Sequence, residues 1–473
     1  MTLRDVLGDA ARDAPPVEVT ALAFDDRLVA PGTLFFCVPG FTRDGHDFAA
    51  DAIARGASAL VVQRPLGLGV PEVVVDDVRA AMAPAAARLH GDPTATLRAV
   101  GITGTNGKTT TAFLVRDLLE AAGRRTGLVG TVTAVVGGRE RPMVRTTPEA
   151  IELQGMFAEM VSAGDEAVVM EVSSHALHLH RADAIHWDVA IFTNLTQDHL
   201  DFHPTMEDYF IAKRRLFESG PRVAVINVDD PYGARLASEI PGAVTVGIDS
   251  PEASLRATGI AGDATGSTFT ADGMTLRSPL PGRFNVLNVL TAVAAVRALG
   301  VGDEAIAAAL PHAARVPGRF EPVDEGQAFA VLVDYAHTHD SLENVLRAAR
   351  PLATGRVICV FGAGGDRDRA KRPLMGAVVR DLADIAIVTS DTPRSEDPEA
   401  IIAAILEGAG PGAEVEVDRR RAIERAVRMG EPGDIVLIAG KGHEQGQEFE
   451  DGRKVPFDDV SVAREALRAR LVA

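Results

Sequence analysis

Short apolar runs alternate with amphipathic helical segments along most of the chain. Residues 97–103 are mostly apolar and lead into a glycine-rich stretch, which predicts a strand followed by a loop. Between residues 108 and 122 the apolar side chains fall on one helical stripe, which predicts an amphipathic helix. The stripe consists of Leu114, Val115, Leu118 and Leu119.

The same alternation continues through the rest of the chain. Helical patterns separate apolar runs at residues 167–170, 189–192, 223–226, 329–333, 357–361, 385–388 and 435–439. This pattern is typical of α/β folds with largely parallel sheets. Ligands of such sheets bind at the carboxyl ends of strands, so the residues that close these runs are the first candidates for chemistry.

Two turn-rich interruptions divide the pattern. Residues 91–93, Gly-Asp-Pro, end an alanine-rich helical stretch, and residues 316–318, Val-Pro-Gly, precede the last group of apolar runs. A chain of 473 residues is too long for one hydrophobic core. We therefore expect three domains, at residues 1–95, 96–316 and 317–473, with residues 316–318 as a hinge.

Composition narrows the class of protein. Hydrophobic residues at 46% and charged residues at 24% are ordinary for a globular protein, and a formal net charge of -18 argues against a nucleic-acid partner. No segment is long and apolar enough to cross a bilayer, and the first residues lack the pattern of a secretory signal. We expect a cytoplasmic protein without membrane insertion.

Cysteines and histidines give no convincing metal motif. Cys37 and Cys359 lie far apart, which predicts two small buried side chains in a reducing compartment. Four histidines gather within a short segment, but their spacing offers at most one helical pair, so we interpret them as parts of a polar helix and loop. One of them, His175, stays a candidate substrate contact. The four are His175, His178, His180 and His186.

The glycine-rich stretch at residues 101–110 has the chemistry of a phosphate loop. Gly104 and Gly107 let the backbone turn its N–H groups inward, and the helix that follows adds the partial positive charge of its N-terminus. Lys108 can reach the β- and γ-phosphates of a nucleoside triphosphate, and the Thr109 hydroxyl suits Mg²⁺. Because a strict Walker pattern needs glycine at Ile102, this loop is a variant, and an ordinary glycine-rich turn is the alternative.

Two further side chains follow predicted strands. Glu171 closes one apolar run, and His199 lies in the polar stretch after the next. We expect both at the sheet edge that carries Lys108, where they suit a phosphate-bound metal. Taken alone, Glu171 is better explained as a cap or ion-pair carboxylate and His199 as a solvated loop histidine, but their joint placement after strands favours the metal site.

The last group of strands predicts an amino-acid site. Arg367 and Arg394 follow two of these strands and offer planar forks for a carboxylate, whereas Glu444 after a third strand can hold an ammonium group. Surface ion pairs are the alternative, and we favour that interpretation for Arg369, Lys371 and Arg372.

Several strings together resemble the Mur ligases, the ATP-dependent amide-bond formers of peptidoglycan synthesis. The most specific strings are similar to the MurE type, which adds the third amino acid to UDP-N-acetylmuramoyl-L-alanyl-D-glutamate. The strings are GTNGKTT from Gly104, MEVSSHAL from Met170, TNL from Thr193, DHLD from Asp198, DYAHT from Asp334 and GGDRD from Gly364.

The resemblance implies three domains: an N-terminal α/β domain that binds UDP, a central P-loop-type domain with a mostly parallel sheet, and a C-terminal Rossmann-like α/β domain. It implies that Lys213 is carbamylated and ligates Mg²⁺ together with Thr109, Glu171 and His199, and that the catalytic set is Lys108, Glu171, His199 and Lys213. Asn285 and Asn288 match the adenine side, Arg319 the phosphate side and Asp334 the ribose contact. The remaining ATP contacts are Gly104, Thr105, Asn106, Gly107, Lys108, Thr109 and Thr110.

Two sets of substrate contacts also follow from the resemblance. The UDP-muramoyl dipeptide would contact the region from Asp26 to His46 and a second group, Thr146, Thr147, Ser173 and Arg181. The contacts to diaminopimelate would be Arg367, Thr392, Arg394, Gly440 and Glu444.

The chain departs from the family pattern at several positions. Asp26 stands where serine is usual, Leu179 where glutamine is common, and Thr392 where diaminopimelate users carry asparagine. Ala363 and His339 are two further departures, which we expect not to affect the chemistry. Meso-diaminopimelate is the expected amino acid, with the LL isomer or lysine as alternatives.

The implied reaction transfers the γ-phosphoryl group of ATP to the D-glutamyl carboxylate, and the amine then displaces phosphate. We expect a monomer acting on small molecules. The alternatives are a folylpolyglutamate synthase-like ligase, a catalytically silent nucleotide-binding partner in cell-wall assembly, and a P-loop ATPase that drives motion.

Overall fold

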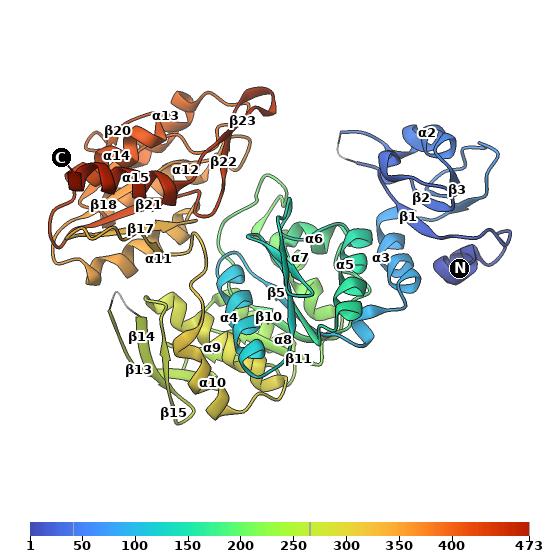
Figure 1. Ribbon diagram of the computed structural model, residues 1–473, viewed down its shortest axis with the longest axis horizontal. Coiled ribbons are helices and arrows are strands. Elements are labelled where there is room, and N and C mark those ends of the chain that lie inside the picture. Colours follow the sequence, from blue (N-terminus) through green and yellow to red (C-terminus); the bar gives the residue numbers. More distant parts are fainter. Residues whose placement is uncertain (41, 264–265, 473) are drawn as a thin grey trace. The chain divides into compact units, whose positions relative to one another are not determined.

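The computed structural model describes residues 1–40, 42–263 and 266–472 (Figure 1). The chain divides into two compact units, each discontinuous in sequence. Unit 1 comprises residues 1–103, 119–191 and 211–224, and unit 2 comprises residues 104–118, 192–210 and 225–473.

Unit 1 begins with a parallel sheet whose two faces are both covered. Leu34 and Phe36 of β2 pack with helices α1 and α3, whereas Phe35 and the next residue after the strand, Cys37, pack with α2, because successive strand residues point to opposite faces. This sheet has the strand order β1-β2-β3-β4. Its elements are α1 (Leu3–Leu7), β1 (Ala21–Ala23), β2 (Thr33–Phe36), α2 (Ala49–Ala54), β3 (Ala57–Val62), β4 (Glu72–Val74) and α3 (Val78–Leu89).

The rest of unit 1 contains strands in the order β10-β5-β9-β6-β7-β8. β5, β9 and β6 pair in parallel, and β7 and β8 continue as an antiparallel meander. Gly101 on β5 allows close packing, because a Cβ there would lie 2.8 Å from the Trp187 ring. The elements are β5 (Arg98–Thr103), β6 (Thr126–Val129), β7 (Ala134–Val136), β8 (Arg139–Arg141), α5 (Ala150–Ala163), β9 (Ala167–Glu171), α6 (Ser174–His178), β10 (Trp187–Phe192) and most of α7 (Met206–Glu218).

Unit 2 holds the phosphate loop, most of α4 (Lys108–Ala121) and strands in the order β15-β14-β13-β12-β11. β11, β12 and β13 pair in parallel, whereas β13, β14 and β15 form an antiparallel meander. The elements are β11 (Val223–Asn227), α8 (Pro231–Glu239), β12 (Val244–Gly247), β13 (Leu255–Asp263), β14 (Gly266–Ala271), β15 (Met274–Ser278), α9 (Arg283–Ala298) and α10 (Asp303–Ala309).

A second sheet in unit 2 has the order β16-β17-β21-β18-β19-β20. All of its strands except β16 run parallel. One face packs against α11, α12 and α13, and the other against α14 and α15 (Figure 1). The elements are β16 (Glu321–Pro322), β17 (Ala330–Asp334), α11 (His339–Ala349), β18 (Val357–Phe361), α12 (Lys371–Leu382), β19 (Ile385–Val388), α13 (Pro398–Ala409), β20 (Glu414–Val415), α14 (Arg419–Met429), β21 (Ile435–Ala439), β22 (Gly446–Glu448), β23 (Lys454–Pro456) and α15 (Asp459–Val472), where β22 and β23 form a separate hairpin.

The seven apolar runs are strands, as predicted, and the α/β class with mostly parallel sheets is confirmed. Cys37 and Cys359 are both buried free thiols, also as predicted. Burial raises the pKa of each thiol to about 12, so both stay protonated and unreactive at neutral pH.

Helices α14 and α15 are joined by a fully buried ion pair. Arg419 donates to both carboxylate oxygens of Asp459 at 2.8 and 2.7 Å, and neither side chain is exposed. A neighbouring pair, Arg420 with Glu465, joins the same helices but is about half exposed.

We expect Asp459→Ala to destabilise unit 2 by about 3–5 kcal/mol, because it leaves the Arg419 guanidinium buried without its partner carboxylate. Glu465→Ala is the matched control and should change stability by no more than about 0.5 kcal/mol, because exposed pairs contribute little. Urea unfolding followed by circular dichroism measures both. Equal losses of unfolding free energy in the two variants would contradict a special role of the buried pair of Arg419 and Asp459.

Candidate active site

The phosphate loop depends on two glycines that no other residue can replace. Gly104 and Gly107 have φ angles of 150° and 84°. A Cβ on Gly104 would lie 1.8 Å from the Thr193 hydroxyl oxygen, and one on Gly107 would lie 2.4 Å from Oδ1 of Asn288. The loop therefore packs directly against these side chains, and its shape requires glycine at both positions.

The segment after β10 holds the loop from outside. The N–H groups of Thr105 and Asn106 donate to the backbone carbonyl and the side-chain oxygen of Asn194, at 2.9 and 2.8 Å. The Thr193 hydroxyl donates to the Asn106 carbonyl at 2.7 Å. Thr193 and Asn194, which follow β10, thus hold the loop in its conformation.

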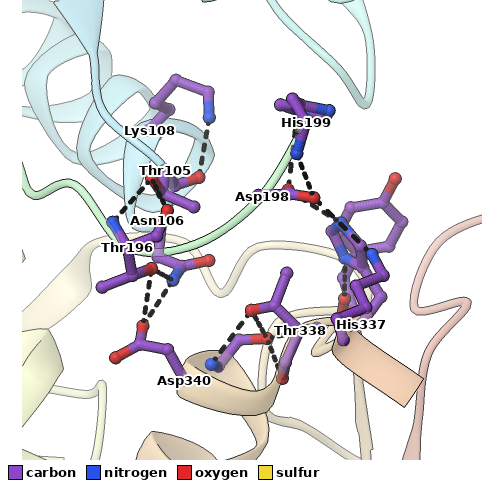
Figure 2. A network of polar contacts seen from close by, with 12 residues as sticks. Thr105, Asn106, Lys108, Thr196, Asp198, His199, His337, Thr338 and Asp340 are labelled. Atoms are coloured by element: carbon purple, nitrogen blue, oxygen red, sulfur yellow. Dashed lines mark hydrogen bonds and ion pairs between the residues drawn. The ribbon is translucent and has the colours of Figure 1, made fainter. Parts of the chain in front are cut away.

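Lys108 begins α4 and turns back over the loop. Its Nζ donates to the carbonyls of Gly104 and Thr105, both at 2.9 Å (Figure 2). The ammonium therefore lies within the loop that would receive a phosphate group, as the sequence predicts for a phosphate-binding lysine.

We call the segment after β10, residues 193–201, the strap. Asp198 lies in its second half and contacts several charged or titratable side chains. It is buried and lies 3.5 Å from His199, 3.7 Å from His337 and 3.6 Å from the Lys371 ammonium (Figure 2). Although burial acts to raise its pKa, the charges of these neighbours hold the pKa of Asp198 well below its ordinary value. The carboxylate therefore stays ionised and fixes the backbone before His199, whose φ is 56°.

The expected surface positions of Lys371 and Arg372 are wrong. Both side chains are buried: Lys371 faces Asp198, and Arg372 forms a bidentate pair with Glu396. They begin α12, where Arg372 also donates to the Gly364 carbonyl, and a sequence pattern cannot show such long-range contacts. Arg369 is exposed and pairs with Glu396, as predicted.

A cavity of about 370 Å³ opens beside the loop, within the usual range of ligand sites. It is lined by residues from the loop, the strap, α9 and the start of α11, including Asn285, Asn288, Arg319 and Asp334. The side-chain Nδ2 of Asn288 donates to Oδ1 of Asn285 at 3.1 Å, which fixes the orientation of the two side-chain amides. The sequence-predicted nucleotide contacts of unit 2 thus come together around one cavity.

Arg319 and Asp334 are fixed by their neighbours. The Arg319 guanidinium stacks over the Tyr335 ring at 4.5 Å and donates to the Thr109 hydroxyl at 3.1 Å. Asp334 accepts the N–H groups of Phe320 and Ala336, at 2.6 and 2.8 Å. Burial raises the pKa of Asp334, and these donors together with Arg319 oppose that rise.

In unit 1, Glu171 ends β9 and is buried. Its carboxylate accepts the N–H and the hydroxyl of Thr131, at 2.8 and 3.0 Å, and its carbonyl accepts the Thr147 hydroxyl at 2.9 Å. Thr147 also accepts the Ser173 N–H, and Thr146 lies 3.0 Å from the Thr131 hydroxyl. The structure therefore gathers Thr146, Thr147 and Ser173 around Glu171.

The remaining predicted contacts of unit 1 are placed as follows. Arg181 pairs with the buried Glu149 at 2.7 Å. Asp26 lies 3.5 Å from Arg55, and the buried His46 is held between Asp44 and the Gln63 N–H. Lys213 on α7 is 1% exposed. His175 and His178 lie on α6, and His180 and His186 follow it in loops.

No group of three or more histidine, cysteine, aspartate or glutamate side chains within residues 1–40, 42–263 and 266–472 is arranged to hold a metal ion. Hydroxyl and carboxylate oxygens, such as those of Thr109 in unit 2 and Glu171 in unit 1, are the ligand types that Mg²⁺ prefers.

The predicted amino-acid residues lie together at the carboxyl ends of β18, β19 and β21. The Thr392 carbonyl accepts the Gly365 N–H at 2.9 Å, and Arg394 donates to the Gly365 carbonyl at 2.6 Å. A Cβ on Gly440 would lie 2.7 Å from Asp391. Arg367, in the same loop as Gly365, donates to the carbonyl of its neighbour Asp366.

Lys441 is a central residue of this rim that the sequence analysis missed. Its buried ammonium donates to the Thr392 hydroxyl at 3.1 Å and to Glu444 at 2.9 Å, and it lies 3.7 Å from Asp391. The string GKGHE shows a lysine between two predicted contacts, but a lysine surrounded by glycines predicts exposure, so only the fold shows that it is buried.

No helix of the described residues is both long enough and apolar enough to span a membrane.

Models of known protein families match most of the chain. The Mur ligase family catalytic domain matches residues 18–90, the Mur ligase middle domain residues 102–296 and the Mur ligase glutamate ligase domain residues 318–442.

Similar proteins extend over nearly the whole chain. The UDP-N-acetylmuramoyl-L-alanyl-D-glutamate--2,6-diaminopimelate ligase of Geobacillus thermodenitrificans is 49% identical, with 96% of each chain covered. The ligase of the same name from Streptomyces coelicolor is 47% identical, with 98% of this chain and 96% of the relative covered.

Solved structures of Mur ligases also have the fold of this chain. A structure titled UDP-N-acetylmuramoyl-L-alanyl-D-glutamate--2,6-diaminopimelate ligase is 33% identical with a TM-score of 0.71, and covers 100% of this chain and 99% of that one. The expected three-domain α/β architecture is thereby confirmed. Folylpolyglutamate synthase of Mycobacterium tuberculosis, at 19% identity, a TM-score of 0.61 and coverage of 83% of this chain and 94% of that one, shows a shared fold alone. The chain belongs to the Mur ligase family.

Proposed function

We propose that the chain is an ATP-dependent ligase that joins meso-diaminopimelate to UDP-N-acetylmuramoyl-L-alanyl-D-glutamate in peptidoglycan biosynthesis. The observation that carries the proposal is the identity of 45–49% over at least 96% of the chain to ligases of that name. The phosphate loop with its cavity and the rim with Arg394 and Glu444 supply chemistry that this reaction needs.

The reaction begins with activation of a carboxylate, which is too poor an electrophile for direct attack by an amine. One D-glutamyl carboxylate oxygen attacks the γ-phosphorus of ATP, and the bond to the β-γ bridging oxygen breaks, giving an acyl phosphate and ADP. The amine then attacks the acyl carbon and phosphate leaves, with loss of one amine proton. During these steps negative charge shifts between the phosphate and acyl oxygens, and the Lys108 ammonium neutralises it.

In this proposal Thr109, Glu171, His199 and a carbamate on Lys213 hold Mg²⁺, which when bound would screen the phosphate charges. The nearly complete burial of Lys213 supports the carbamate, because a carbamate at this position would be held away from bulk water. The resulting anion would supply the oxygen ligands that an ammonium group cannot.

The substrate contacts keep the assignments made from the family pattern. Asp26, His46, Thr146, Thr147, Ser173 and Arg181 bind the UDP-muramoyl dipeptide. Arg394 binds the distal carboxylate of diaminopimelate, Glu444 can hold its ammonium group, and Arg367, Thr392 and Gly440 make the other contacts to this amino acid. Glu444 already accepts a hydrogen bond from Lys441, so its carboxylate is held in place for a second ammonium group.

The domain boundaries near residues 95 and 316 are part of the proposal, with residues 316–318 as the hinge. We also propose that the protein is a monomer. We propose a cytoplasmic location because ATP and nucleotide-linked sugars are cytoplasmic substrates.

Lys108→Ala should reduce phosphate release to about 10⁻³ of the wild-type rate or less, because a positive charge held against the transferring phosphoryl group stabilises the transition state by several kcal/mol. The measurement is phosphate release with ATP, the muramoyl dipeptide and diaminopimelate. Lys454→Ala, at an exposed strand position, is the control and should retain full activity. Near-normal turnover of Lys108→Ala would refute the loop assignment.

Arg394→Ala should raise the Michaelis constant for diaminopimelate at least about tenfold and leave that for ATP unchanged, because a charged hydrogen bond to the distal carboxylate is lost. Steady-state kinetics with each substrate varied in turn tests this. Arg369→Ala, at an exposed position nearby, serves as the control. An unchanged constant for diaminopimelate would remove Arg394 from the site.

A crystal structure of the active, magnesium-bound protein should show carbamate density beyond Nζ of Lys213. Depletion of carbon dioxide should lower activity, and added bicarbonate should restore it. An unmodified amine in active, metal-bound crystals would rule out the carbamate.

A further inference from the structure

Four aspartates line the cavity beside the phosphate loop, together with Arg319. They are Asp229, Asp230, Asp334 and Asp340. Carboxylates repel phosphate groups and accept hydrogen bonds, so such a wall suits a part of the ligand that carries hydrogen-bond donors. The phosphates belong instead at the loop, where the helix N-terminus and Lys108 lie.

Three of these carboxylates are engaged on both oxygens by backbone N–H groups. Asp229, Asp230 and Asp334 therefore fix the loops around the cavity. The donors are Ile248, Asp249 and Ser250 for the first, Leu195 and Gly233 for the second, and Phe320 and Ala336 for the third.

Asp340, in the first turn of α11, is arranged differently. Its Oδ2 accepts hydrogen bonds from Asn106 at 2.7 Å and Thr196 at 3.2 Å (Figure 2). The same oxygen accepts a hydrogen bond from Asn344 at 3.3 Å. Its Oδ1 receives no hydrogen bond from any residue that the structure describes. One oxygen of this half-buried carboxylate, which lines the cavity, thus keeps both lone pairs for a ligand.

The half-buried position of this carboxylate weakens its solvation. Burial raises the pKa of Asp340, which means that the charged form is poorly solvated where it lies. A ligand donor would offset that weaker solvation and gain a charge-assisted hydrogen bond, which is stronger than a neutral one.

We propose that Oδ1 of Asp340 accepts a hydroxyl of the ATP ribose, and that the same carboxylate ties the sugar to the phosphate loop through Asn106. This inference rests on the proposed use of ATP and adds a second acceptor beside Asp334, so that each of the two ribose hydroxyls has a carboxylate. Asp340 is a binding residue for the sugar and takes no part in phosphoryl transfer.

Direct binding to the full chain tests the proposal without requiring ligation. Isothermal titration with ATP, 2′-deoxy-ATP and 3′-deoxy-ATP, at one magnesium concentration, should show that the wild type binds at least one deoxy analogue about 10- to 100-fold more weakly than ATP. Asp340→Ala should bind ATP as weakly as the wild type binds that analogue, and should lose little further affinity for the analogue itself.

Two further variants sharpen the test. Asp340→Asn keeps the side-chain size and should give an intermediate loss of affinity for ATP, which protects the test if the alanine variant fails to fold. Glu343→Ala removes a carboxylate from the same helix, where it pairs with Arg347, and should bind all three nucleotides as the wild type does.

Two outcomes would overturn the inference. Equal wild-type affinity for all three nucleotides would show that no hydroxyl is recognised. An equal loss of affinity for all three nucleotides in both Asp340 variants would show that Asp340 contacts only the phosphate loop or the adenine amino group, and no ribose hydroxyl. Preserved hydroxyl discrimination in a chain without ligase activity would instead refute the proposed function and leave this inference intact.

Discussion

The absence of side chains at Gly104 and Gly107 is the constraint on which the nucleotide site depends. Each glycine lies so close to a neighbouring side chain that one added carbon would overlap it. The contacts that exclude a Cβ, with Thr193 and Asn288, also connect the loop to the strap and to α9. The loop, the strap and the cavity wall therefore hold one another in place.

Unit 2 places its ionised groups in two networks with different tasks. Around Asp198, three cationic or titratable side chains stabilise one buried carboxylate and thereby position the backbone near His199. At the amino-acid rim, the single ammonium of Lys441 is shared by Thr392, Glu444 and Asp391. Buried charges of this kind cost free energy unless fully paired, so their retention indicates a role in positioning rather than in stability.

The sequence predicted the strands, the phosphate loop and the grouping of the rim residues, because periodicity and strand-end position are local properties. It did not predict the burial of Lys371, Arg372 and Lys441, because lysine and arginine usually lie at the surface and burial depends on loops that fold over them. It also missed Asp340, whose importance follows from which of its two oxygens the fold engages. Such hydrogen-bond accounting requires coordinates.

The four carboxylates around the cavity beside the loop also bear on inhibitor chemistry. A competitive compound that fills about 370 Å³ with apolar surface alone would remove water from these oxygens and leave Oδ1 of Asp340 without a donor, at a desolvation cost. Scaffolds that present hydroxyl, amino or amidine groups towards this wall should bind more tightly than isosteres that present ethers or carbonyls. The polarity of the wall, more than its shape, would then decide which compounds bind.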